Sequence, residues 1–285
     1  MKAFRTFFAC TALLLTTACT QIGITAANLP THFDGSVQKT TDIAFSTAPA
    51  LSLDIYRPAR SAGKSLPVIV FFYGGRWTFG DRAQYAFAGN ALAQRGYVVV
   101  VPDYRKYPDV KFPSFAQDAG NAVAWTYDHI ADYGGDPARL YVAGHSAGAH
   151  LGALVATDPH YLAKSGKKRD VIRAFAGLAG PYAFIPEEPD LKDMFGPPEN
   201  YVRMQVPTFV DGAQPSMLLL WGSDDTAVGR FNMDRLAARI HEKGGVVETK
   251  IYPGISHAWI VGALSWLGQR KAPVLDDIDT FFRKH

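Results

Sequence analysis

Short apolar runs alternate with amphipathic segments along most of the chain. A continuous apolar run is typical of a strand that is buried on both faces, as in a parallel sheet covered by helices. We expect such strands at residues 67–72, 96–103, 139–143, 174–178, 217–221 and 246–252. Residues 36–56 alternate more weakly, most clearly at 51–56, and this pattern predicts an antiparallel edge strand with one face in water.

Segments with a helical repeat fill most of the gaps between these runs. In residues 115–133, the side chains of Ala116, Ala119, Val123 and Tyr127 form one stripe. Further helices are expected at 85–95, 147–157, 230–243 and 274–284. Strands that alternate with helices predict an α/β protein, in which helices flank a mostly parallel central sheet on both faces.

Residues 180–215 interrupt this rhythm. The segment is rich in proline and aromatic residues, contains several acidic residues, and is longer than a crossover between neighbouring strands requires. Insertions of this kind are often lids or binding loops. An ordinary irregular connection explains the pattern equally well, so we expect either a small lid-like insertion or a plain connection.

Composition and charge limit the range of functions. The 285 residues suit one domain, which we place at 36–285. The formal net charge is only +3, and no basic run with interleaved aromatic residues occurs, so we expect no nucleic-acid partner. A hydrophobic content of 48% fits a globular protein with a large core.

The first residues have the features of an export signal. Lys2 and Arg5 precede a short apolar stretch at 7–15, which is too short to span a membrane stably. The sequence around Cys19 resembles a bacterial lipoprotein cleavage box, although Thr16 stands where leucine is usual. We therefore expect a signal at 1–19, lipidation of Cys19 and membrane contact through that anchor in the bacterial cell envelope.

Two alternatives to this anchor stay open. The mature protein would be soluble in the periplasm or secreted if Cys19 is not lipidated, and an uncleaved segment would itself act as the anchor. Both cysteines of the chain, Cys10 and Cys19, lie in the signal, so the sequence predicts no internal disulfide. Residues 20–35 lack periodicity and are expected to form a tether.

The candidate nucleophile lies between a predicted strand and a predicted helix. Gly144-His145-Ser146-Ala147-Gly148 follows the run 139–143 and has the pattern Gly-x-Ser-x-Gly. In this position the pattern predicts a sharp, strained turn that exposes the serine hydroxyl. The following helix N-terminus supplies free N–H groups and the positive end of a dipole. Ser146 is therefore the predicted nucleophile of a hydrolase.

A serine nucleophile requires a base and a group that orients the base. Asp225 follows the strand run 217–221 and fits the pattern Gly-x-x-Asp-x-x-Val, with Asp224 as the alternative. His257 lies in the loop after the run 246–252, ahead of the last predicted helix, and is the predicted general base. The order serine, aspartate, histidine is that of the α/β-hydrolase fold.

The other histidines compete less well for the role of base. His145 and His150 are tied to the serine by short stretches of chain. We expect His145 to pack under the turn and His150 to form a buried hydrogen bond. The remaining candidates have surface-like surroundings: His129, His160, His241 and His285.

An oxyanion hole should be formed by the residue after the serine and by a loop after an earlier central strand. Ala147 supplies the first N–H. Gly74 and Gly75 follow the run 67–72, and adjacent glycines can turn their N–H groups toward a substrate. We assign both glycines as donors and favour Gly75.

These features resemble the α/β-hydrolase superfamily over most of residues 37–285. The serine turn, the loop 74–77 and the sequences at 103–105 and 135–137 are similar to a narrower group. That group contains hormone-sensitive-lipase-like carboxylesterases, bacterial feruloyl-esterase-like domains, prenylcysteine methylesterases and kynurenine formamidases. Its oxyanion motif usually begins with a histidine that orients the loop, whereas this chain has Tyr73.

Other positions shared with this group are expected to be structural. Asp118 is expected to pair with Arg105 or to cap a loop, and Gly135-Asp136-Pro137 to form a turn ahead of the serine strand. Arg76 and the insertion 180–215 are expected to shape the mouth of the pocket. The Arg76 side chain would be solvated or would face an acidic acyl group.

The resemblance implies a serine carboxylic-ester hydrolase that acts on a small-molecule ester through an acyl-enzyme and needs no cofactor. Two alternatives remain: an amide hydrolase of the arylformamidase type, and a catalytically inactive hydrolase fold that serves as a binding module. The sequence contains no recognisable set of metal ligands, phosphate loop or dinucleotide fingerprint.

Overall fold

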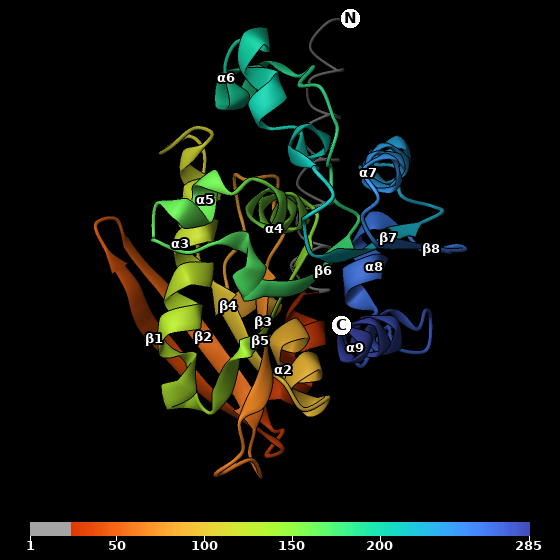
Figure 1. Ribbon diagram of the computed structural model, residues 1–285. Coiled ribbons are helices and arrows are strands. Elements are labelled where there is room, and N and C mark those ends of the chain that lie inside the picture. The colour runs from red at the N-terminus through yellow and green to blue at the C-terminus, as the bar shows by residue number, and fades with distance from the viewer. Residues whose placement is uncertain (1–23) are drawn as a thin grey trace, which may run out of the picture.

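A computed structural model describes residues 24–285 (Figure 1). The predicted export signal at 1–19 and the lipidation of Cys19 lie outside the described residues. One sheet of eight strands runs through this part of the chain, in the order β1-β2-β4-β3-β5-β6-β7-β8. The strands are β1 Val37–Thr47, β2 Ala50–Pro58, β3 Leu66–Phe72, β4 Val98–Pro102, β5 Gly135–His145, β6 Ile172–Leu178, β7 Ser216–Gly222 and β8 Val247–Tyr252.

Helices cover both faces of the sheet. On one face α3, α4 and α5 pack together, and on the other α2 contacts α9 (Figure 1). The α-helices are α2 Ala86–Gln94, α3 Ser114–His129, α4 Ala147–Thr157, α5 His160–Ala163, α6 Pro189–Phe195, α7 Phe231–Glu242, α8 His257–Gly262 and α9 Val274–Lys284. The 3-10 helices are η1 Leu29–His32, η2 Ala83–Tyr85, η3 Ile130–Tyr133, η4 Arg169–Val171, η5 Pro198–Arg203 and η6 Val206–Phe209.

The sheet confirms the predicted fold class. From β4 to β8 every neighbouring pair is parallel, and only the pairs β1–β2 and β2–β4 are antiparallel. The apolar runs that predicted the central strands are almost fully buried in β3, β4, β5 and β6. Burial on both faces explains why these runs are continuous and do not alternate.

The prediction of one edge strand in 36–56 was wrong. The segment forms a hairpin, in which β1 is the edge and β2 is the second strand. Tyr56 in β2 is buried because α2 packs on this strand and Gly89 of α2 lies against the Tyr56 ring, and Leu53, which points to the opposite face, is buried as well. The alternation in 36–56 is weak because the segment contains two strands with different surroundings: β1 is exposed at the edge of the sheet, and β2 is covered.

The segment expected to be a tether contributes to the folded domain from Ile24 onward. Residues 24–28 are helical, and η1 follows them. Ala27 is buried, and the Asn28 side chain accepts a hydrogen bond from the Phe87 N–H and donates one to the carbonyl oxygen of Gln84. Within residues 24–285, no helix is both long enough and apolar enough to cross a membrane.

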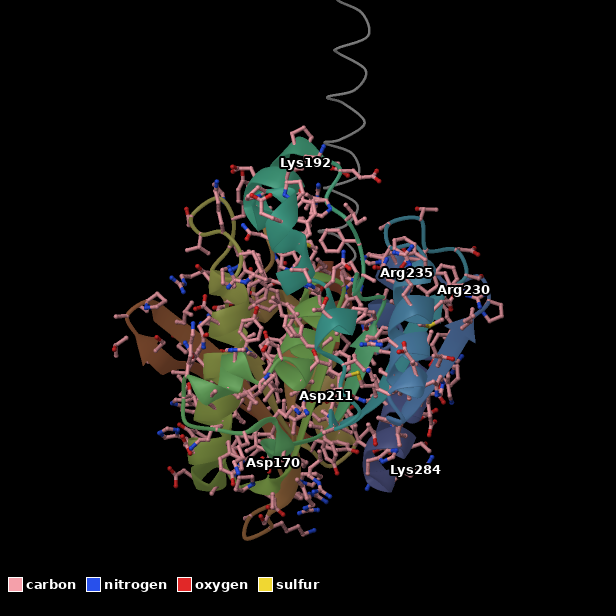
Figure 2. The ribbon with its side chains drawn as sticks, turned by 45° about the horizontal axis from the view of Figure 1, so that its top comes forward. Asp170, Lys192, Asp211, Arg230, Arg235 and Lys284 are labelled. Carbon is pink, nitrogen blue, oxygen red and sulfur yellow. The ribbon has the colours of Figure 1, made fainter. Side chains whose placement is uncertain are left out.

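The insertion 180–215 lies between β6 and β7 and contains α6, η5 and η6. In Figure 1, α6 lies beyond the layer formed by α4 and α5. Figure 2 labels Lys192 on α6 and both Arg230 and Arg235 at α7. A role of the insertion as a lid stays a prediction.

Two structural expectations can be compared with the coordinates. Arg105 donates to both carboxylate oxygens of Asp118 at 2.8 Å, which confirms that the two residues pair. Gly135-Asp136-Pro137 is already the first part of β5, so the expected turn ahead of this strand was wrong. The strand starts early because Gly135 pairs with Leu66 of β3, before an irregularity in the register.

Candidate active site

Ser146 lies at the sharp turn between β5 and α4. Its backbone has φ 54° and ψ −121°, in a region that residues other than glycine rarely adopt. A Cβ on Gly144 would lie 2.5 Å from the Gly148 carbonyl oxygen, and one on Gly148 would lie 2.2 Å from the carbonyl oxygen of Phe72. Glycine at both positions therefore allows the close approach of strand and helix that this turn requires.

His257 links Ser146 to Asp225 by hydrogen bonds. Its Nε2 lies 2.9 Å from Ser146 Oγ, and its Nδ1 lies 2.8 Å from Asp225 Oδ2. His257 is the first residue of α8, so its placement in a loop ahead of the last helix was wrong. The helix was missed because it has only six residues, His257–Gly262.

The loops after β7 and β8 are tied together, which explains why Asp225 and His257 meet. Ser223 N–H donates to the carbonyl oxygen of Tyr252, and Asp224 N–H donates to the carbonyl oxygen of Ile255. The Asp225 Oδ1 accepts hydrogen bonds from Ala227 N–H and Val228 N–H, each at 2.8 Å. Its other carboxylate oxygen is thereby directed at His257.

The surroundings of Asp225 favour its ionised form. Burial raises the pKa of this carboxyl, but hydrogen bonds from His257 and from the Val228 and Ala227 N–H groups outweigh burial and lower the pKa below its ordinary value. Asp224, the alternative acid, is exposed and accepts a hydrogen bond from Ser223 Oγ. The geometry therefore selects Asp225 as the partner of His257.

His145 connects the backbone of His257 to Tyr85. Its Nε2 lies 3.0 Å from the carbonyl oxygen of His257, and its Nδ1 lies 3.1 Å from Tyr85 Oη. Burial, together with the nearby His257, lowers the pKa of His145 to about 3. The neutral imidazole must donate from Nε2, because a carbonyl oxygen can only accept, so Nδ1 accepts from the tyrosine hydroxyl.

The predicted oxyanion loop, residues 74–77, packs against Tyr85. A Cβ on Gly74 would lie 3.0 Å from the Tyr85 hydroxyl, and burial raises the pKa of this tyrosine. In the part of the chain that the structure describes, the N–H groups of Gly75 and Arg76 have no protein acceptor. Both residues have positive φ, 141° at Gly75 and 54° at Arg76. Sequence reasoning considered only the side chain of Arg76.

Tyr73 holds the start of the same loop in place through contacts with Asp103 and Tyr104. Its side chain is buried, its hydroxyl donates to Asp103 Oδ1 at 3.0 Å, and its ring stacks on that of Tyr104 at 4.6 Å. The Tyr104 hydroxyl donates to the Tyr73 carbonyl oxygen at 3.0 Å. Arg82 also contacts Asp103, so the tyrosine belongs to a network that fixes the start of the loop.

His150 lies in the interior, on the first turns of α4. Its Nε2 donates to the carbonyl oxygen of Met204 at 2.7 Å, which confirms the expected buried hydrogen bond. Burial lowers its pKa to about 4. His129 packs against Trp125, and His160 contacts Asp158, both away from Ser146.

Ser146 and His257 line a pocket of about 810 Å³. The pocket lies where the oxyanion loop, the insertion, α7, α8 and residues 24–28 meet. Its walls are mostly apolar or aromatic and include Ala27, Trp77, Phe79, Phe87, Phe184, Leu191, Val228, Phe231, Trp259, Val261 and Leu267. Phe79 and Phe231 are 61% and 45% exposed, so aromatic side chains also line the mouth.

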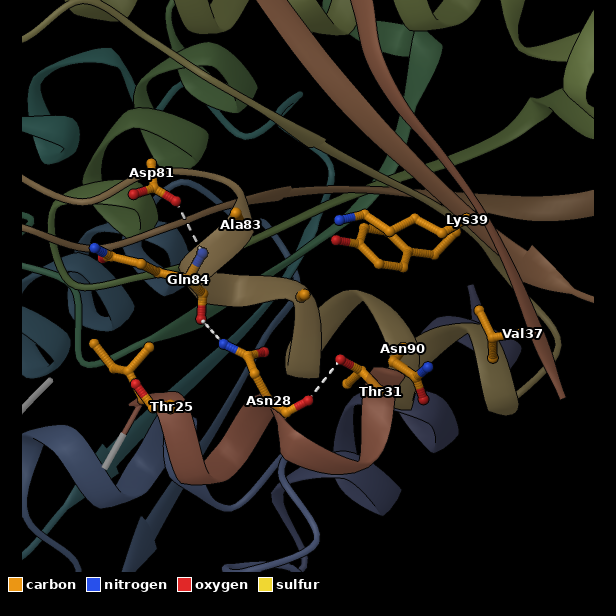
Figure 3. A pocket seen from close by; sticks show the side chains of 12 residues that line it. Thr25, Asn28, Thr31, Val37, Lys39, Asp81, Ala83, Gln84 and Asn90 are labelled. Carbon is orange, nitrogen blue, oxygen red and sulfur yellow. Dashed lines mark hydrogen bonds between the residues drawn. The ribbon is translucent and has the colours of Figure 1, made fainter. Parts of the chain in front are cut away.

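A second pocket of about 410 Å³ lies between residues 24–31, the strands β1 and β2, and the start of α2 (Figure 3). Asn28, Gln84 and Asp81 line it and form hydrogen bonds along its wall (Figure 3). It contains no nucleophile with an adjacent base. Among residues 24–285, no group of three or more His, Cys, Asp and Glu side chains is placed to bind a metal ion.

A known protein family matches this chain. The BD-FAE family matches residues 53–239, which is more than half of the chain and includes Ser146 and Asp225. The chain belongs to the BD-FAE family. The match ends before His257, so the family comparison does not reach the proposed base.

Sequence relatives of this BD-FAE chain are named as esterases. It is 28% identical over 247 residues to isoprenylcysteine alpha-carbonyl methylesterase ICME of Arabidopsis thaliana, covering 78% of this chain and 57% of the relative. It is 30% identical over 240 residues to esterase LipC of Mycobacterium tuberculosis, covering 76% of this chain and 59% of the relative. The chain thus spans little more than half the length of these relatives.

Solved structures support the fold of this BD-FAE protein. Esterase B from Lactobacillus rhamnosis superposes with a TM-score of 0.76 at 21% identity, covering 96% of this chain and 95% of that one. An esterase from Thermogutta terrifontis with butyrate bound superposes with a TM-score of 0.73 at 23% identity, covering 88% and 94%. The fold is therefore the α/β-hydrolase fold.

The pocket walls are the part of the site that sequence reasoning missed. Tyr85, Phe87, Phe231 and Trp259 come from four separate elements and share no local motif. Aromatic residues are common in every hydrophobic core, so their presence in the sequence does not predict which of them line a pocket. Only the position of these elements around Ser146 identifies them.

Proposed function

We propose that this protein is a serine carboxylesterase that acts on small-molecule esters. The observation that carries the proposal is the continuous line of hydrogen bonds from Asp225 through His257 to Ser146, at the side of a large pocket. Such a line is the arrangement by which a weak hydroxyl nucleophile is activated. The names of the sequence relatives support the same reaction class.

In the acylation step, Ser146 Oγ attacks the ester carbonyl carbon, and its proton passes to His257 Nε2. Asp225 accepts the hydrogen bond from Nδ1–H and stabilises the resulting imidazolium. The bond from the carbonyl carbon to the alcohol oxygen then breaks, and His257 returns the proton to the leaving alcohol. The acyl group remains on Ser146.

The tetrahedral intermediate carries a negative oxygen that requires N–H donors. Ala147 is the first residue of α4, so its N–H is left without an intrahelical partner. Gly75 supplies the opposite N–H, with the N–H groups of Gly74 and Arg76 beside it. The positive end of the α4 dipole favours the same charge.

Hydrolysis of the acyl-enzyme repeats these steps with water. His257 takes a proton from a water molecule, whose oxygen attacks the acyl carbon. The acid product leaves when Ser146 Oγ regains the proton. The reaction consumes one water and one ester, and no redox partner or further reactant enters it.

The test is the Ser146→Ala variant assayed with phenyl esters of short acids. We expect kcat to fall about 10⁴- to 10⁶-fold with the fold intact, because the variant has no nucleophile. A fluorophosphonate probe should label the wild type and not the variant. A folded variant with wild-type turnover would refute the mechanism, and a preference for N-formylkynurenine over phenyl esters would reassign the protein to amide hydrolysis.

We also propose that the protein is exported and held at the bacterial envelope through a lipid on Cys19. This proposal rests on the sequence of the first residues alone.

A further inference from the structure

Fixed charge in the Ser146 pocket is confined to one place. Of the described residues that line it, Arg76 is the only arginine or lysine and Glu188 is the only carboxylate. The remaining walls are apolar, aromatic or uncharged, apart from His145 and His257. A salt bridge between a charged substrate and a fixed charge that lines this pocket would therefore involve Arg76 or Glu188.

Arg76 is already neutralised by the insertion. Its Nη2 lies 2.5 Å from Glu188 Oε2 and 3.2 Å from Asp190 Oδ2, so two carboxylates share one guanidinium nitrogen. The three side chains together carry a net charge of −1. The net negative charge of this group would repel the carboxylate of a substrate. That carboxylate would also have to displace one of the two partners of Arg76.

Given the proposed esterase function, we propose that the pocket selects uncharged esters with bulky apolar groups and discriminates against esters that carry a carboxylate. The cavity of about 810 Å³ is in the range that accommodates a drug-sized molecule. Phe184, Leu191 and Phe231 supply apolar walls of the same pocket. Glu188 and Asp190 are the residues that determine the charge selectivity.

The size of the effect follows from exposure. The side chains of Arg76, Glu188 and Asp190 are 37%, 64% and 43% exposed, so water and salt screen their charges. We expect discrimination of about two- to fivefold in kcat/KM. The discrimination should weaken at high salt, because the interaction is electrostatic.

The experiment uses two matched pairs of esters. In the first, 4-methylumbelliferyl pentanoate is compared with 4-methylumbelliferyl hemiglutarate, which places a carboxylate at the end of the acyl chain. In the second, phenyl butyrate is compared with 4-carboxyphenyl butyrate, which places it on the alcohol side. The wild type should favour the neutral member, after correction for the hydroxide-catalysed rate of each ester.

The decisive variant is Glu188→Gln/Asp190→Asn, which frees Arg76. It should raise kcat/KM for the carboxylate member of at least one pair by about five- to tenfold, while the neutral members stay within about twofold. The pair that responds identifies which side of the ester bond faces Arg76. An unchanged ratio in both pairs, or a wild-type preference for the carboxylate members, would overturn the proposal.

Two further variants serve as controls. Glu187→Gln/Glu199→Gln removes two carboxylates from exposed positions of the same insertion that do not contact Arg76, and should leave the ratios unchanged. Adding Arg76→Gln to the decisive variant should abolish its increase in kcat/KM for the carboxylate esters. If the increase persists, it does not come from Arg76, and the proposal that Glu188 and Asp190 neutralise this arginine toward substrates is overturned. Failure of the esterase function itself would look different, because no ester would be hydrolysed faster by the wild type than by Ser146→Ala.

Discussion

At the scale of single residues, Tyr85 and His145 connect two parts of the site that lie on separate loops. Gly74 lies against the Tyr85 hydroxyl, Tyr85 donates to His145, and His145 donates to the carbonyl oxygen of His257. These contacts join the predicted oxyanion loop to the proposed base. Both hydrogen bonds have a defined donor, so they fix Tyr85 and the His257 backbone relative to His145.

We predict that Tyr85→Phe lowers kcat about ten- to a hundredfold with little change in KM, because small displacements of reacting groups are costly. Steady-state kinetics with a phenyl ester measures the effect. Tyr97→Phe is the matched control, since Tyr97 is also buried but donates to Asp279 away from the site. Equal kinetic losses in both variants would show that Tyr85 acts only through general stability.

At the scale of elements, the unit formed by β5 and α4 contains two buried neutral histidines. His145 ends the strand, and His150 lies one turn into the helix. Burial lowers the pKa of His145 to about 3 and that of His150 to about 4, from an ordinary value of 6.5. As the pH falls from about 6.5 toward 4, the unfolded chain binds protons at these histidines and the native state does not. The neutral histidines therefore make their full contribution to the free energy of unfolding above pH 6.5, and this contribution decreases below that pH.

We predict that the free energy of unfolding decreases below pH 6.5, with a slope that approaches about 1.4 kcal/mol per pH unit for each histidine. His150→Gln should remove about one histidine's share of this slope, whatever its effect on stability at pH 7.5. Urea unfolding between pH 7.5 and pH 5 measures both slopes. His129→Gln, at an exposed position, is the control and should leave the slope unchanged. The prediction is contradicted if the free energy of unfolding of His150→Gln depends on pH with the same slope as that of the wild type.

At the scale of the whole molecule, the site is assembled from distant segments around the central strands. The serine follows β5, the aspartate follows β7 and the histidine follows β8, which are parallel strands of one sheet. Parallel strands bring their carboxyl ends to the same edge, so loops far apart in the chain meet there. Residues 24–28 close one side of the pocket, which brings the start of the folded domain next to the site.

We predict that the wild-type protein fractionates with membranes and that Cys19→Ser moves most of it to the soluble fraction, because the cysteine is the proposed site of lipidation. Fractionation of the producing cells, followed by immunoblotting, measures the shift. Cys10→Ser is the control and should leave the distribution unchanged. A wild-type protein found wholly in the soluble fraction would exclude the lipid anchor.

The sequence by itself determined the fold class, the bounds of α4 and α9, and the candidates Ser146, Asp225 and His257, because continuous apolar runs and a turn motif are local signals. It left Asp224 open, placed one edge strand where a hairpin forms, and missed α8. Only the tertiary structure decided that Asp225 faces His257, that Tyr85 lies against Gly74, and that Glu188 and Asp190 neutralise Arg76. Those contacts join residues from separate elements, and their partners are set by the packing of the sheet and its loops, which no local pattern records.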